Sequence, residues 1–387
     1  MRQSAPAKDI SYRLHDIDAT TLLFRVKKGA PGPEQPGPRA DIYTFLQSHP
    51  RSNMNDLWVN IPSIGFPGVE GYEKARKIVA RMVDRGILET CGELPLEVVD
   101  ARYERVDTCD LCGASTKNHP VLFWKHNTPM ARCTGCGIIY ANPRWKSEYL
   151  FGRYTPDYWE HYTELIKHTA IDPAANQRFY HAPLSFLEAA RQTGRILDVG
   201  CASGEFLSAA SARNWEVYGL EPSPIGSALA ERVPGATIYT GTLDTAPWPD
   251  GWFDAVTLFE VIEHLQSPTA YVEKIARLVR PGGMFALTTP NIRSLAYRLL
   301  GTRWDPVGPN DHLYLFSPRT LESLLRDHGF VVHQMHTMAT EAETWRRWLR
   351  HPALHRLAPA LRAATLPVTS RLMLGDAVFL VARRVEE

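Results

Sequence analysis

The sequence predicts an α/β fold built on a doubly wound, mostly parallel sheet, and the order of its apolar segments is the main reason. From about residue 176, short apolar strands alternate with helical segments, a pattern that specifies parallel strands with helices on both faces. The first strand also runs through a small-residue turn directly into a helix, as ligand-binding loops do at the edge of such a sheet. The strands are expected at residues 195–200, 216–221, 253–260, 284–290, 329–336 and 376–384, with a helical insertion near 341–365 before the last.

The composition is that of a globular protein. The chain has 387 residues, of which 44% are hydrophobic and 22% charged, enough apolar matter for two or three cores. Its 43 Lys+Arg and 42 Asp+Glu leave a net charge of +1, so no overall field attracts nucleic acid or an anionic membrane. The sequence contains neither a spanning apolar segment nor the apolar core of a signal peptide, and we expect a cytoplasmic protein.

Residues 1–100 are predicted to form an α+β accessory domain. Four prolines and two glycines within residues 31–39 indicate a linker or an ordered loop, since proline does not fit a helix interior or a central strand. A strand is expected before it at 22–29 and a short helix after it at 40–50. Apolar residues at spacings of three and four predict an amphipathic helix over 68–87, with a strand following. This order of elements is typical of a winged-helix unit.

The charges of this domain bear on its role. Helix-turn-helix domains have a similar order of elements and bind DNA. Residues 1–100, however, hold 13 Lys+Arg and 13 Asp+Glu, so the excess positive charge that neutralises phosphates is missing. We therefore favour packing, homodimerisation, substrate covering or docking to a carrier protein or peptide over nucleic-acid binding.

Residues 101–150 are predicted to form a zinc ribbon. Two CxxC pairs are separated by 20 residues, the spacing of a four-thiolate zinc site. A glycine follows the second thiol of each pair and supplies the backbone freedom that such a knuckle needs. Four thiolates leave no position for water or substrate, so the zinc ion is expected to be structural, with redox use or an iron site as the alternatives. The expected ligands are Cys109, Cys112, Cys133 and Cys136.

The predicted third domain, residues 151–387, carries the glycine-containing loop. Gly200 and Gly204 let the backbone approach a ligand, and the helix that follows offers free amide groups. Glu221 closes the next strand, 17 residues after Gly204, where a carboxylate can accept both hydroxyls of a ribose. A lysine followed by Ser or Thr is absent from the loop, which disfavours a P-loop.

At these residues the chain resembles the class I S-adenosylmethionine (SAM)-dependent methyltransferases, which have a Rossmann-like fold. Asp198, Gly200 and Gly204 match the family's first motif, and Ala202 stands at its middle glycine. The resemblance continues through Glu221, through residues 248–265 and through Arg280–Gly283, and covers roughly residues 175–340. It implies that Asp198 and the backbone of 200–204 hold the methionine moiety and that Glu221 holds the ribose. It also places Thr242 and Leu243 beside the adenine, and Phe259 and Glu260 among the cofactor-binding residues.

His312 is the expected general base. It follows the fifth strand, on the edge where open α/β sheets bind their substrates, and the neighbouring Asp311 could orient it or raise its pKa. A histidine with a purely structural role on a loop is the alternative. Glu260, Glu263 and His264 would share one face if they lie on a helix, and some methyltransferases bind a divalent cation through this pattern, which His312 could complete.

The order of a four-cysteine ribbon followed by this domain resembles that of the zinc-ribbon methyltransferases, a group that includes deoxysugar C-methyltransferases. In those relatives a histidine preceded by an acidic residue is the base, and Asp311 and His312 match that pair with aspartate in place of the usual glutamate. The relatives typically continue into another large domain, whereas about 50 residues follow 329–336 here. We therefore expect a small-molecule acceptor: a specialised metabolite, a sugar or a carrier-bound intermediate.

Two other classes of protein are compatible with parts of the sequence. A nucleic-acid-binding or RNA-modifying methyltransferase would use the accessory domain and the ribbon to bind its substrate, but the charge balance disfavours it. An NAD-dependent oxidoreductase would not need the motifs at 260–265 and 280–283. Residues 345–362 hold five arginines among Trp and Leu and could contact a membrane or a partner, although such a segment is more often an insertion over the active site.

Overall fold

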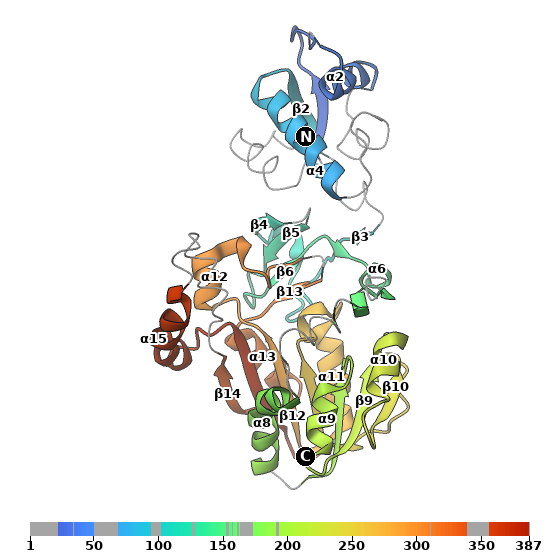
Figure 1. The fold of residues 1–387 in the computed structure, drawn as a ribbon, viewed down its shortest axis with the longest axis vertical. Coiled ribbons are helices and arrows are strands. Elements are labelled where there is room, and N and C mark those ends of the chain that lie inside the picture. The colour runs from blue at the N-terminus through green and yellow to red at the C-terminus, as the bar shows by residue number, and fades with distance from the viewer. Residues whose placement is uncertain are drawn as a thin grey trace.

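The computed structural model of the chain shows a seven-stranded mixed sheet with helices on both faces, below a small ribbon and an N-terminal unit (Figure 1). It describes residues 22–33, 35–49, 69–93, 102–125, 128–151, 155–156, 158–160, 162, 173–190, 193–309, 311–338 and 356–386. Among these residues, no helix is long and apolar enough to cross a membrane.

The large sheet contains the six predicted strands and a seventh, β10 (Thr237–Thr240), that the sequence analysis did not predict. Its order is β10-β9-β8-β11-β12-β15-β14, and β15 runs antiparallel to both of its neighbours while the other pairs are parallel. The carboxyl ends of the parallel strands therefore meet at one edge. The strands are β8 (Arg195–Val199), β9 (Glu216–Glu221), β10 (Thr237–Thr240), β11 (Phe253–Phe259), β12 (Val279–Pro290), β14 (Phe330–Thr337) and β15 (Ala377–Arg384).

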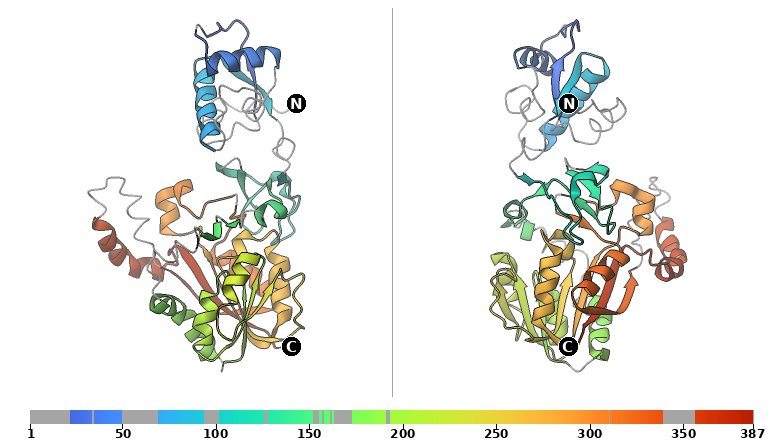
Figure 2. Two further views of the ribbon diagram at one scale, coloured as in Figure 1. Left: turned by 45° about the vertical axis from the view of Figure 1, so that its right-hand side comes forward. Right: turned by 180° about the vertical axis from the view of Figure 1, so that it is seen from behind.

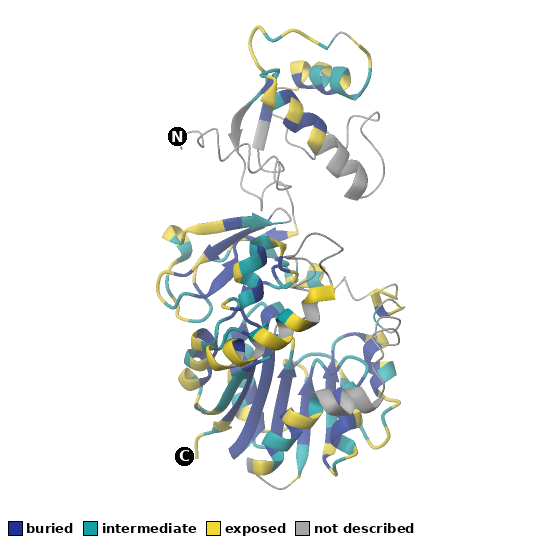
Figure 3. Ribbon diagram, turned by 60° about the vertical axis from the view of Figure 1, so that its left-hand side comes forward, coloured by how far each residue is buried: buried dark blue, intermediate teal, exposed yellow. Residues whose placement is uncertain are grey.

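Alternate side chains of the central strands enter two separate cores, one on each face. Ile196 packs with residues of α8 and α9, whereas Leu197 packs with residues of α11 and α13, as the two-residue period of a strand requires. Figure 3 shows these strands as a buried layer between the helices. The helices are α8 (Pro173–Ala190), α9 (Glu205–Ser211), α10 (Pro224–Ala230), α11 (Pro268–Leu278), α12 (Leu295–Leu300), α13 (Pro318–Asp327) and α15 (Ala358–Arg371).

Three of these helices begin with the same Ser-Pro pair. The side chains of Ser223, Ser267 and Ser317 each accept a hydrogen bond from a backbone amide of the first turn, and a proline occupies the first helical position. Proline is suited to that position because its missing N–H would have no partner inside the helix. The sequence therefore fixes where these helices start, and with them the lengths of the preceding loops.

The ribbon is joined to the large domain by backbone pairing. Its four-stranded sheet has the order β13-β6-β5-β4, and β13 (Tyr314–Leu315) comes from the segment just after His312. Side chains of both parts belong to one apolar core, in which Met130 and Ile138 of the ribbon lie in the same cluster as Leu313 and Phe316. The apolar core therefore includes residues from both sides of the domain boundary predicted near residue 150. The ribbon strands are β4 (Val121–Lys125), β5 (Thr128–Arg132) and β6 (Ile139–Ala141); β3 (Tyr103–Glu104) pairs with β7 (Arg144–Trp145) beside them, and α6 (Ser147–Phe151) follows.

The N-terminal unit has its own small core. Strands β1 (Leu22–Val26) and β2 (Leu88–Glu93) pair antiparallel, and helices α2 (Pro38–Ser48) and α4 (Val69–Asp84) pack on them through Phe24, Ile42, Leu46 and Val79. The two views of Figure 2 show this unit apart from the large sheet. Its helices and strands lie where the sequence predicts them, except that α2 begins inside the proline-rich segment, because Pro38 occupies its first position. The winged-helix assignment stays a prediction, and the insertion expected near 341–365 falls largely outside the described residues.

Candidate functional site

The loop between β8 and α9 adopts a conformation that depends on its small residues. Gly200 and Gly204 have positive φ angles of 78° and 90°, and a Cβ at either position would lie within 2.6–2.7 Å of a valine methyl group. The Gly200 amide donates to the carbonyl of Leu220 at 2.7 Å, which ties the loop to β9. Ala202 has a φ of 47°, a left-handed conformation that costs a non-glycine residue about 1–2 kcal/mol. The alanine in place of the family's glycine therefore stores strain in the loop.

Glu221 lies at the end of β9 and is hydrogen-bonded to two backbone amides. Its Oε1 accepts from the amide of Ser223 at 2.9 Å, and its Oε2 accepts from the amide of Ala202 at 3.1 Å. The side chain is buried, and this burial raises the pKa of its carboxyl group above the usual value. The carboxylate thus connects the end of β9 to the β8–α9 loop, as expected of a residue that receives ribose hydroxyls at this edge.

Asp198 is a second buried carboxylate of this edge. Its Oδ1 accepts a hydrogen bond from Oγ1 of Thr257 at 2.7 Å. Burial raises its pKa to about 7, and the negative charges of Glu205 and Glu221 add to the rise. Three acidic groups, Asp198, Glu205 and Glu221, therefore gather around the loop, an environment that favours a positively charged ligand.

The sequence reasoning missed an aromatic wall beside these acids. Tyr180 of α8 stacks on Phe259 with ring centroids 6.2 Å apart and meets Phe206 edge to face at 5.4 Å. The pKa of its phenol is raised by burial and by the nearby Asp198. Trp159 donates from Nε1 to Oγ of Ser223 at 2.7 Å, so a second aromatic ring lies against the turn that follows Glu221. Both rings precede the first motif in sequence, where no spacing pattern identified them.

The residues expected beside the adenine follow β10. The amide of Gly241 donates to the Glu221 carbonyl at 3.0 Å, and this bond brings the next two residues, Thr242 and Leu243, near the end of β9. Leu243 is buried, whereas Thr242 is partly exposed. Their position agrees with the expected role, which stays a prediction.

The segment that follows β11 corrects one expectation. Glu260, Glu263 and His264 do not share a helix: Glu260 has a φ of 54° just after the strand, and Ile262–His264 form a single 3₁₀ turn. The Glu260 amide donates to both the carbonyl and Oγ1 of Thr288, which fixes this bend at the neighbouring strand. A positive φ cannot be part of a right-handed helix, so the periodicity argument failed at this residue.

Glu263 is buried in this turn. Its Oε2 accepts from Oγ1 of Thr289 at 2.9 Å, and its Oε1 has no hydrogen-bond partner within the described part of the chain. Burial and the negative charge of Glu260 raise the pKa of Glu263 well above the usual value. Nε2 of His264 lies 4.0 Å from Oε1 of Glu263. A buried carboxylate oxygen without a hydrogen bond is costly, so this position favours a donor or a cation.

His264 and His312 are both held at Nδ1 by a main-chain carbonyl. Nδ1 of His264 lies 2.9 Å from the carbonyl oxygen of Asp311, and Nδ1 of His312 lies 2.8 Å from that of Pro306. A carbonyl can only accept, so both Nδ1 atoms carry the proton and both Nε2 atoms are unprotonated when the rings are neutral. One ligand atom of each histidine and one carboxylate oxygen of Glu263 lie within 4.8 Å of one another, a set that could hold a metal ion.

Asp311 orients His264 through its main chain. The group that orients the His312 ring at Nδ1 is the Pro306 carbonyl, while the main-chain carbonyl of Asp311 orients His264. The expectation that the Asp311 side chain supports His312 therefore stays a prediction.

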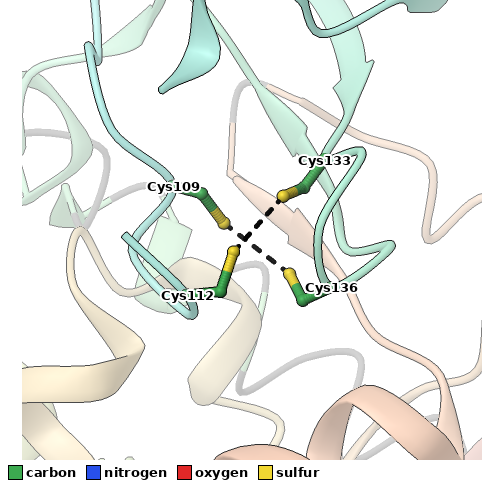
Figure 4. A group of neighbouring side chains, drawn as sticks. All are labelled: Cys109, Cys112, Cys133 and Cys136. Atoms are coloured by element: carbon green, nitrogen blue, oxygen red, sulfur yellow. Dashed lines mark hydrogen bonds between the residues drawn. The ribbon is translucent and has the colours of Figure 1, made fainter. Parts of the chain in front are cut away.

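The four ribbon cysteines come together as their spacing predicts. Sγ of Cys109 lies 3.7 Å from that of Cys136, and Sγ of Cys112 lies 3.5 Å from that of Cys133 (Figure 4). A tetrahedral site with zinc–sulfur bonds of about 2.3 Å needs sulfur atoms about 3.8 Å apart. Gly113 and Gly137 have positive φ angles and donate to the carbonyls of Cys109 and Cys133, which closes the two knuckles. The residues present therefore fit a four-thiolate zinc ion.

Comparison with known proteins bears on the large domain. The family described as "Methyltransferase domain" matches residues 172–335. This part of the chain is therefore similar to a methyltransferase domain. It contains the β8–α9 loop, Glu221 and the two histidines, so the candidate site lies within the matched residues. The ribbon cysteines and the N-terminal unit lie outside the matched residues.

Curated relatives carry a more specific name. A ubiquinone biosynthesis O-methyltransferase from Alkalilimnicola ehrlichii is 31% identical over 153 residues, which are 36% of this chain and 62% of that protein. One from Methylocella silvestris is 29% identical over 168 residues, 41% of this chain and 63% of that protein. The chain thus spans less than two thirds of the length of these relatives.

Solved structures are similar to part of the chain. A SAM-dependent methyltransferase from Archaeoglobus fulgidus has a TM-score of 0.42 at 17% identity, covering 58% of this chain and 99% of that one. A geranyl diphosphate C-methyltransferase from Streptomyces coelicolor has a TM-score of 0.40 at 16% identity, covering 54% of this chain and 80% of that one.

Proposed function

We propose that the protein transfers the methyl group of SAM to a small-molecule acceptor. The observation that carries the proposal is the position of the two histidines: they follow β11 and β12, whose carboxyl ends lie at the same sheet edge as Asp198 and Glu221. Val261, in the segment that leads to His264, lies against Gly200, so the cofactor loop and the histidine segment are in contact. A methyl donor bound at the acids would therefore have the histidines on its acceptor side.

The acidic groups suit this cofactor. SAM carries a sulfonium and an ammonium cation, and the buried carboxylate of Asp198 offers the complementary charge. Its ribose presents two hydroxyls that can donate to Glu221, which accepts charge-assisted hydrogen bonds. In the transfer step the sulfur–methyl bond breaks as the bond from the methyl carbon to the acceptor atom forms in line, and the main task of the protein is alignment.

His312 is the proposed base. Its Nε2 is unprotonated in the neutral ring, because Nδ1 donates to the Pro306 carbonyl. It would take the proton that the acceptor loses when the methyl group arrives. The names of the curated relatives favour an acceptor oxygen, whereas the resemblance to the zinc-ribbon enzymes favours an activated carbon; in both cases the proton leaves the atom that receives the methyl group.

A second role for His312 is supported by the missing partner of Glu263. Together with His264 and Glu263 it offers two imidazole lone pairs and one carboxylate oxygen, a donor set that suits divalent cations. Such an ion would supply Lewis-acid polarisation of an acceptor oxygen. The two roles differ in one measurement: turnover that is unchanged after chelation and dialysis supports the base, and turnover restored by added Mg²⁺ or Mn²⁺ supports the ion.

The ribbon is proposed to bind one structural zinc ion through its four cysteines, as their sulfur spacing supports. For the accessory domain we keep a packing, dimerisation or carrier-docking role ahead of nucleic-acid binding. The ultraviolet absorbance ratio of the purified protein tests this choice: a ratio typical of free protein agrees with it, and co-purifying nucleic acid contradicts it.

A further inference from the structure

We propose that Arg144, which belongs to the ribbon, is a positioning residue for methyl transfer. One guanidinium nitrogen binds both the segment that carries His264 and the segment that carries His312, and so fixes the distance between the two imidazoles. This inference rests on the proposed function, since it assigns a part of the ribbon to the acceptor side of that site.

The contacts of Arg144 form a triangle. Its Nη1 donates to the carbonyl oxygen of Gln266 at 2.6 Å and to the phenol oxygen of Tyr314 at 3.0 Å. The hydroxyl of Tyr314 in turn donates to the same Gln266 carbonyl at 3.2 Å. Gln266 lies two residues after His264, and Tyr314 lies two residues after His312. The triangle therefore joins the two segments two residues after each histidine.

Arg144 is itself held in place. Its Nε donates to Oε1 of Glu104 at 3.1 Å, and only 12% of its side chain is exposed. The next residue, Trp145, accepts a hydrogen bond at its carbonyl from Nε2 of Gln266 at 2.6 Å. The planar guanidinium group can make these bonds in fixed directions, which a flexible ammonium group cannot do equally well.

The cost of this arrangement argues for a role beyond attachment. Arg144 is nearly buried, and its carboxylate partner Glu104 is 39% exposed, so the desolvation of the cation is only partly offset. The ribbon is already attached to the large domain by the β6–β13 pairing and by a shared apolar core. Apolar residues at position 144 could extend that core at lower cost, whereas only a multiple donor can bind both segments at once.

The distance between the His264 and His312 rings is expected to affect the rate of methyl transfer. The rings of His264 and His312 lie edge to face with centroids 4.6 Å apart, and an in-line transfer loses rate steeply when the reacting groups are displaced by about 1 Å. Without Arg144, the Gln266 carbonyl and the Tyr314 hydroxyl keep one bond between them, and His264 keeps its bond to the Asp311 carbonyl. The single side chain that binds both Gln266 and Tyr314 is lost. The two segments could then move apart while the cofactor loop keeps its contacts.

The test compares Arg144→Met and Arg144→Lys with Arg132→Met, a control at an exposed arginine of the same ribbon. Each variant is purified with zinc and measured for zinc content, SAM affinity by calorimetry, and kcat and KM. A readout without turnover accompanies these: the ¹³C-imidazole resonances of His264 and His312, assigned by the single His→Ala variants. Tyr314→Phe serves as a second, milder disruption of the triangle.

We expect Arg144→Met to lose about 10–100-fold in kcat while SAM affinity changes by less than about twofold, and both histidine resonances to shift. Arg144→Lys should recover part of the kcat, Tyr314→Phe should lose less, and Arg132→Met should behave as the wild type. Unchanged kcat together with unmoved resonances in Arg144→Met overturns the proposal. If that variant does not fold, the same criteria apply to Arg144→Lys and Tyr314→Phe. A wild-type protein that transfers no methyl group refutes the proposed function, and the resonances then still decide the role of Arg144.

Discussion

The rings of His264 and His312 meet edge to face with an interplanar angle of 85°, although 47 residues separate them in the chain. Each ring is held at Nδ1 by a main-chain carbonyl, so Nε2 is the unprotonated nitrogen of each neutral ring. Because the two rings are in contact, single substitutions of each histidine can distinguish a lone base from a metal-binding pair.

If His312 acts alone as the base, the two histidine variants should lose turnover to different extents. His312→Ala should slow turnover by about 100-fold or more with SAM affinity near normal, whereas His264→Ala should cost much less. Steady-state kinetics of both variants, with the exposed His333→Ala as control, measure the difference. Equal losses in both variants, joined by inhibition with EDTA, would favour the cation instead.

The role of Glu221 predicts weaker cofactor binding. Glu221→Ala should lower SAM affinity by about 2 kcal/mol, because charge-assisted hydrogen bonds to the ribose are lost. Isothermal titration calorimetry checks this value, with the exposed Glu231→Ala as control. An affinity equal to that of the wild type would remove Glu221 from the cofactor site.

The high pKa of Asp198 predicts a pH-dependent stability in the absence of cofactor. With a folded pKa of about 7 against an ordinary value of 3.8, the folded protein binds more protons than the unfolded chain between these values. The free energy of unfolding therefore falls as the pH rises from about 4 to 7, the reverse of a salt-bridged aspartate. Asp198→Asn keeps an acceptor for Thr257 and removes this loss.

We expect Asp198→Asn to be more stable than the wild type at pH 8, by up to about 4 kcal/mol, and similar to it at pH 4. The same variant should bind SAM less tightly, since the complementary charge is gone. Urea unfolding at the two pH values without SAM measures the first effect, with the exposed Asp250→Asn as control. A variant that gains no stability at pH 8 would show that Asp198 is ionised at little cost.

The ribbon predicts a zinc-dependent stability. Cys112→Ser should lower the bound zinc below one ion per chain and reduce thermal stability, while SAM binding persists in the folded fraction. Elemental analysis and a thermal melt of the variant beside the wild type measure this. Protein prepared under reducing conditions that contains no metal, or a disulfide among the four cysteines, would contradict the zinc assignment.

The fold could be predicted where a pattern of nearby residues, such as an apolar run between turn residues, was strong. The strands at 195–199 and 216–221 lie within a residue of their expected bounds, because continuous apolar runs were bounded by turn residues. Glu221 and the CxxC pairs could be found because their spacing alone restricts where they lie. Such signals need no knowledge of the rest of the chain.

Other features depended on contacts that no local pattern encodes. Strand β13 is two residues long and exists only because β6 pairs with it, so the junction of ribbon and large domain was not foreseen. Glu260, Glu263 and His264 would share one face only on a helix, but the Glu260 amide binds the next strand and the residue has a positive φ. Arg144 had no sequence signal, since its partners are a main-chain carbonyl and a distant phenol.

The most direct test of the proposed activity follows the methyl group itself. The protein is incubated with SAM carrying a ¹³C-labelled methyl group and with separated small-molecule, protein and nucleic-acid fractions of a cell extract, and mass spectrometry locates the label. We predict labelled product and S-adenosylhomocysteine with the small-molecule fraction, both strongly reduced for His312→Ala. Label found only in protein or nucleic acid, or no S-adenosylhomocysteine above the level without enzyme, would contradict the account.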